Sequence, residues 1–244
     1  MNYHIYKLNM YEYFIYGILY LLIDAIIAYL FFMSIIPFIL FLPFIFAYYK
    51  YLSFFLKQKR DKLLTLQFKE FLSIICTLLS TGYSLENAIS ESTKELNALY
   101  PNSLILDEVI KMSHKISLRI PPDLLFTDLA NRCDIEHIKT FSEILTIATK
   151  SGGNLIQIII STTSSISTQI DIHREIDTAL AGKKYEFFIM AIMPLIIIIY
   201  VKVTQPGFFN SVYNNILGGI LMFICLSFYI FAIYLAYKII SRIH

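Results

Sequence analysis

Two apolar regions flank one polar region along this chain of 244 residues. Nearly all Asp, Glu, Lys and Arg residues lie between positions 57 and 186, whereas residues 13–49 contain a single charge, Asp24. An apolar stretch of that length exceeds the roughly 20 residues that one membrane-spanning helix needs. The pattern therefore predicts membrane spans on both sides of a polar domain.

Two short spans fit the first apolar region, at residues 13–31 and 35–53, joined by a tight turn near Ser34 and Pro37. One span over residues 25–49 is the alternative. The two-span interpretation places the N-terminal membrane region at residues 1–56, ahead of a polar domain at residues 57–186.

The second apolar region, residues 187–244, divides at a polar loop. Residues 187–201 form one span, and Pro194 inside it removes a helical hydrogen bond and predicts a kink. Residues 202–215 form the loop, and residues 216–237 form the last span. Four spans follow for the whole chain.

Basic residues gather where the predicted spans meet the polar domain and at the C-terminus: Lys57, Lys59, Arg60, Lys62, Lys183, Lys184, Lys238 and Arg242. Cytoplasmic segments next to spans are enriched in Lys and Arg. The polar domain and both termini are therefore expected in the cytoplasm. A composition that is 57% hydrophobic is too apolar for a soluble globule, so membrane lipid is an expected partner.

The polar domain has helical periodicity and no strand-like alternation. Apolar residues recur at spacings of three and four, for example at Phe68, Phe71, Leu72, Ile75, Leu78 and Leu79. A further helix is predicted over residues 104–119, and a short one over residues 123–131, with Pro122 in its first turn and Leu125 and Leu129 buried. We expect an all-α bundle of about six helices.

Two turn sequences in this domain resemble each other. Gly82 can end one helix and Ser84 can cap the next, and Gly152, Gly153 and Asn154 offer the same functions. A shift of 70 positions aligns Phe71 with Phe141, Ile74 with Ile144, Ile75 with Leu145, Thr81 with Ser151, Leu85 with Leu155 and Ile89 with Ile159. The alignment predicts two related helical hairpins; chance similarity between amphipathic helices is the alternative.

Charged residues of both signs precede the third span. They are Arg174, Glu175, Asp177, Lys183 and Lys184, on the long helix that the second turn begins. We interpret them as a docking face for a cytoplasmic partner; a solvated face with weak ion pairs is the alternative.

The sequence contains no motif that is typical of catalysis, cofactor binding or metal binding. Lys183 and Lys184 follow Gly182 without the rest of a phosphate-binding loop, and the single pair Cys133 and His137 is too few ligands for zinc. Asp107 and Glu108 are interpreted as exposed helix residues. Acids and bases nearly balance within the polar domain, which argues against nucleic-acid binding.

Asp24 is the one charge within an apolar region. A carboxylate in a membrane costs several kcal/mol, so it is either protonated or hydrogen-bonded against neighbouring helices, or it marks a functional site.

Three segments resemble the bacterial type II secretion system F domain, in the single-domain form of tight-adherence (Tad) pilus platform proteins. They read LQFKEFLSIICTLLSTGYSLENAI, PPDLLFTDLANRCDIEHIKTFSEILTIATKSGGNLIQII and REIDTALAGKKYEFFIMAIMP. The resemblance implies a scaffold of the cytoplasmic membrane rather than an enzyme. Its implied partners are a cytoplasmic hexameric assembly ATPase, pilin subunits and a second platform protein, in an oligomer.

Two other functions stay open from the sequence. A sporulation-channel component of the same domain family would carry fewer spans. A transporter or membrane enzyme would instead be centred on Asp24.

Overall fold

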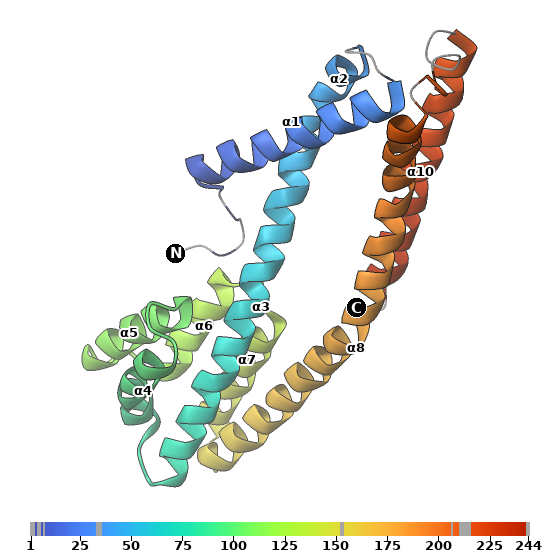
Figure 1. The fold of residues 1–244 in the computed structure, drawn as a ribbon. Helices are drawn as coiled ribbons and strands as arrows, with labels where there is room; N and C mark the ends of the chain where they lie inside the picture. The colour runs from blue at the N-terminus through green and yellow to red at the C-terminus, as the bar shows by residue number, and fades with distance from the viewer. Residues whose placement is uncertain are drawn as a thin grey trace. The chain divides into compact units, whose positions relative to one another are not determined.

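The protein is all-helical over the residues that the computed structural model describes: 3, 6, 8–32, 36–151, 154–205, 207–209 and 216–242. The predicted all-α class is thereby confirmed, and a cytoplasmic location of the bundle stays a prediction. The helices in chain order are α1 (Met10–Phe32), α2 (Ile36–Phe41), the 3-10 helix η1 (Leu42–Phe44), α3 (Ile45–Ser80), α4 (Leu85–Leu99), α5 (Leu104–Ser117), α6 (Pro122–Arg132), α7 (Glu136–Ser151), α8 (Leu155–Thr204) and α10 (Ile216–Arg242) (Figure 1).

Among the described residues, four helices are long and apolar enough to cross a membrane, as predicted. They occupy Met10–Phe32, Pro37–Ser80, Leu155–Thr204 and Leu217–Ala236. Two of them begin before the polar domain, which favours two N-terminal spans over one. These helices fit a multi-pass membrane protein.

The helix that contains most of the second predicted span does not end with that span at residue 53, and the end of the span stays a prediction. Helix α3 continues to Ser80 because its sequence contains neither glycine nor proline. The break in this region lies instead at Pro43 in η1, whereas Pro37 is in the first turn of α2. Ser34, the other residue of the predicted turn, lies outside the described residues.

The chain forms two compact units. We call Met1–Lys7 with Ser53–His173 the helical unit, and Leu8–Leu52 with Arg174–His244 the apolar unit. Helices α3 and α8 each run from one unit into the other without a break. The predicted domain boundaries at residues 57 and 186 mark where the charged part of the sequence begins and ends. As the positions where the chain enters and leaves the membrane, they stay a prediction.

Four phenylalanines form the centre of the helical unit. Phe68 and Phe71 of α3, Phe126 of α6 and Phe141 of α7 are all nearly inaccessible to solvent. Ring centroids lie 5.9 Å apart for Phe68 and Phe141 and 4.9 Å apart for Phe126 and Phe141, within the range of favourable aromatic contacts. The cluster joins α3, α6 and α7.

Short helices of this unit end close to their predicted limits. Helix α6 has Pro122 in its first turn, and both Leu125 and Leu129 are buried as expected. Helix α5 stops at Ser117, two residues before the predicted end, and Arg119 adopts a positive φ of 63°.

Candidate functional site

The turn after α3 has the geometry of a helix C-cap followed by an N-cap. Gly82 has φ of +96°, a conformation that glycine adopts without strain. The backbone N–H groups of Gly82 and Tyr83 donate to Leu79 and Leu78 carbonyls, each over 3.1 Å. Ser84 Oγ then accepts the Asn87 backbone N–H over 3.3 Å and so starts α4.

The turn before α8 starts its helix in the same way. Asn154 Oδ1 accepts the Gln157 backbone N–H over 3.2 Å. The donor Gln157 and the acceptor Asn154 lie 70 positions after Asn87 and Ser84, the donor and acceptor of the first turn. Gly152 and Gly153, the other predicted residues of this turn, lie outside the described residues.

Burial follows the same 70-residue shift across the hairpins. The aligned pairs Phe71 with Phe141, Ile75 with Leu145, and Ile89 with Ile159 are buried. Two pairs beyond the predicted alignment, Phe68 with Ile138 and Leu96 with Ile166, are buried too. In two other aligned pairs the environments differ, because Ile74 and Leu85 are buried whereas Ile144 and Leu155 are half-buried. The shared burial fits two related hairpins, and it also fits amphipathic helices that have the same apolar spacing by chance.

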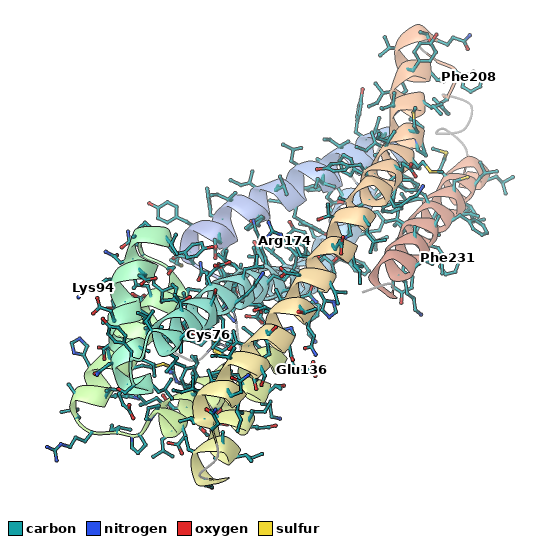
Figure 2. All side chains as sticks on the ribbon, turned by 90° about the horizontal axis from the view of Figure 1, so that it is seen from below. Cys76, Lys94, Glu136, Arg174, Phe208 and Phe231 are labelled. Carbon is teal, nitrogen blue, oxygen red and sulfur yellow. The ribbon has the colours of Figure 1, made fainter. Side chains whose placement is uncertain are left out.

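The proposed docking residues all lie on α8, at the start of the apolar unit. Arg174, Glu175, Lys183 and Lys184 are exposed, and Asp177 is half-buried (Figure 2 labels Arg174). Lys184 Nζ lies 3.4 Å from Asp177 Oδ1. Exposed pairs of this kind contribute at most about 1 kcal/mol, so a partner can replace them at little cost.

Helix α8 continues through Pro194 to Thr204. The charged segment and the apolar segment are therefore parts of one hydrogen-bonded helix. The kink expected at Pro194 stays a prediction.

A buried carboxylate in the helical unit is a feature that the sequence analysis missed. Glu108 of α5 is 1% exposed, so its interpretation as a surface residue is wrong, whereas its neighbour Asp107 is exposed as expected. Glu108 Oε1 accepts from Lys111 Nζ over 2.9 Å and from the Tyr3 hydroxyl over 3.1 Å. The Arg132 guanidinium donates to the other oxygen.

These partners decide the charge of Glu108. Burial alone would raise its pKa, but hydrogen bonds and charge from Arg132 and Lys111 outweigh burial and lower the pKa to about 2. Arg132 also lies 3.2 Å from Asp128 Oδ2, so one guanidinium joins two carboxylates. The arrangement is a satisfied ion-pair network between α5 and α6.

Tyr3 packs into the same unit. Its side chain is 2% exposed, its backbone N–H donates to the Arg132 carbonyl over 2.9 Å, and Arg60 lies over its ring at 5.4 Å from the centroid. Burial and the nearby Glu108 carboxylate raise the pKa of the Tyr3 hydroxyl, which stays a hydrogen-bond donor at neutral pH. No sequence pattern around the tyrosine at position 3 indicates this role.

Asp24 lies in the apolar unit, on α1. Its side chain is 5% exposed, and its Oδ2 has no hydrogen-bond partner among the described residues. A buried, unbonded carboxylate oxygen is stable only in a protonated acid or beside a cation.

Described residues of the helical unit line hollows between neighbouring helices. One, of about 310 Å³, lies between α5 and α6, and its cations Lys111, Lys115 and Arg132 all pair with Glu108 or Asp128. Another, of about 490 Å³, lies between α6 and α7. The described residues include no group of three or more His, Cys, Asp and Glu suited to a metal ion.

Comparison with protein-family models, with curated proteins and with solved structures finds no match for this chain.

Proposed function

We propose that this protein is a platform protein of the bacterial cytoplasmic membrane, in a Tad-type pilus or a type II secretion-like machine. It would couple a cytoplasmic hexameric ATPase to the extraction of pilin subunits from the membrane, alongside a second platform protein. The proposal rests on the sequence resemblance together with the four apolar helices.

One observation carries the proposal: α8 joins a hairpin of the helical unit, an exposed charged segment and an apolar segment without interruption. Before Pro194 the helix contains no proline, so backbone hydrogen bonds hold each of its turns to the next. A displacement applied at Arg174 or Glu175 would therefore pass along the helix axis towards Pro194.

The contacts of Tyr3 support the proposed topology. Tyr3 belongs to the helical unit, and two apolar helices, α1 and the start of α3, separate it from the rest of that unit. If both cross the membrane, the N-terminus returns to the side of the helical unit. The Lys and Arg residues beside the spans favour the cytoplasm for that side.

Co-purification with the ATPase tests the docking face. We expect the combined substitutions Glu175→Ala, Asp177→Ala, Lys183→Ala and Lys184→Ala to lower the amount of retained ATPase about tenfold or more, because about 1.4 kcal/mol of lost interface contacts suffices for that. Membrane insertion, measured by fractionation, should not change.

Glu91→Ala with Lys94→Ala is the matched control. These residues form an exposed ion pair of 2.8 Å on α4, far along the chain from the docking face (Figure 2 labels Lys94). Equal ATPase retention by the α8 variant and this control would reject the docking face.

The sporulation-channel alternative is less favoured because members of that group carry fewer spans. The four apolar helices support the platform interpretation instead. Labelling that placed only one span on each side of the helical unit would reverse this preference.

Asp24 is the observation that favours a second candidate, a transporter or membrane enzyme. Under the platform proposal we expect Asp24→Asn, which keeps the shape of the side chain, to leave ATPase co-purification and pilus assembly within about twofold of wild type, since an amide replaces a protonated acid closely. Loss of a measurable solute flux in Asp24→Asn, with assembly intact, would favour the second candidate.

A further inference from the structure

The hollow of about 310 Å³ between α5 and α6 contains more positive than negative charge. Three cations and two carboxylates line it: Lys111, Lys115, Arg132, Glu108 and Asp128. Beneath them lie the buried side chains of Met112 and Leu125. Lys111 and Lys115 are one helical turn apart, and like charges at that spacing repel each other. The hollow therefore favours one further negative charge.

The two lysines have more hydrogen-bond donors than the acceptors that they meet. An ammonium group has three N–H donors. Lys111 Nζ donates to Glu108 Oε1 over 2.9 Å, and Lys115 Nζ donates to Asp128 Oδ2 over 3.2 Å. Among the described residues, neither ammonium group has a second hydrogen-bond partner. Both lysine side chains are about half exposed, so an incoming anion would find spare donors here.

Two exposed leucines lie at the end of the hollow where α5 leads into α6. Leu118 follows Lys115 by three positions and is 73% exposed. Leu124 precedes Asp128 by four positions and is 56% exposed. Residues three or four apart lie on the same side of a helix, and the contact between Lys115 and Asp128 brings the two sides together. The charged hollow is thus flanked by apolar side chains that no part of the helical unit covers.

We propose that this hollow binds a carboxylate side chain, Asp or Glu, from an apolar segment of a partner protein. The carboxylate accepts hydrogen bonds from Lys111 and Lys115, and apolar neighbours in the partner cover Leu118 and Leu124. One surplus positive charge matches a carboxylate, whereas a phosphate group carries about −1.5 to −2 at neutral pH. The inference goes beyond the proposed function and does not depend on it, because the ATPase docking face lies on α8.

Binding of a labelled peptide to the full-length protein in phosphatidylcholine nanodiscs tests the site. The probe is an amphipathic helical peptide of leucine and glutamate, and its control is the same peptide with glutamine in place of glutamate. Fluorescence anisotropy, corrected for binding to empty nanodiscs, measures the affinity. We expect only the glutamate peptide to bind saturably, and added salt should weaken its binding because it screens exposed charges.

Two substitutions should change the affinity in opposite directions. Lys115→Gln should weaken binding about tenfold, since it removes the surplus charge and a charge-assisted donor. Arg132 stays 3.2 Å from Asp128 in this variant, which preserves the link between α5 and α6. Asp128→Asn should tighten binding about threefold or more, because it raises the surplus to two positive charges. A folding defect cannot imitate tighter binding.

Lys94→Gln is the matched control, because Lys94 is an exposed, ion-paired lysine elsewhere in the helical unit, and it should leave the affinity unchanged. Equal binding of the two peptides, no saturable binding up to about 1 mM, or equal affinity of Lys115→Gln and Lys94→Gln would overturn the proposal. So would the absence of tighter binding in Asp128→Asn, or tighter binding of a peptide with phosphoserine in place of glutamate. The α8 docking-face variant should bind the glutamate peptide as the wild type does, which separates failure of this site from failure of the proposed function.

Discussion

Glu108→Ala is expected to lower the free energy of unfolding of the helical unit by about 3–5 kcal/mol, since it removes one partner of a buried ion-pair network. Arg132 would lose its closest carboxylate, and the buried Tyr3 hydroxyl would lose its acceptor. In a thermal melt followed by circular dichroism in detergent, the midpoint should fall by roughly 10 °C or more.

Asp107→Ala is the matched control, because it removes an exposed acid from the same turn of α5. Its effect should stay below about 1 kcal/mol. Midpoints of the two variants within about 2 °C of each other would contradict the stabilising role of Glu108.

The same network predicts how stability depends on pH. The pKa of Glu108 is lowered in the folded protein, to about 2 from an ordinary value near 4.5. The stabilisation from its ionised form, about 3 kcal/mol, is therefore complete above about pH 5 and is lost as pH falls towards 2. Glu108→Ala should show a smaller loss of stability than wild type over that pH range.

Ala179→Pro is expected to abolish pilus assembly without preventing membrane expression. Ala179 lies between Asp177 and Lys183 on α8, and proline there removes a backbone hydrogen bond and clashes with the preceding turn, at a cost of about 3 kcal/mol or more. The break would separate the charged segment from the apolar segment along which force is proposed to pass.

Counting surface pili by electron microscopy measures the outcome, with membrane fractionation for expression. Ala179→Leu is the control, because Ala179 is exposed and leucine is a strong helix former that keeps the helix intact. A fully piliated Ala179→Pro strain would rule out force transmission along α8.

Local chemistry made much of the fold predictable. Ser84 and Asn154 cap helices because their side chains reach a backbone N–H three residues on, an interaction visible in the sequence alone. Pro122 similarly begins α6. The full length of α3 was not predicted, because the sequence analysis divided this region by charge at Lys57, where nothing in the sequence breaks the helix.

Glu108 shows where local reasoning fails. It follows Asp107 directly, and both are acidic residues of α5. Only the Glu108 side chain is buried inside the helical unit, whereas Asp107 is exposed. Its partners Arg132 and Tyr3 lie 24 and 105 positions away. A sequence pattern that spans a few residues cannot indicate a contact between residues so far apart in the chain.

The sequence by itself determined the helices, the four apolar segments and the repeated turns of this protein, because backbone hydrogen bonding, caps and hydrophobic spacing act over a few residues. Only the tertiary structure decided which charges are buried and that Tyr3 joins the helical unit. Those features depend on which helices meet, and distant residues decide that together.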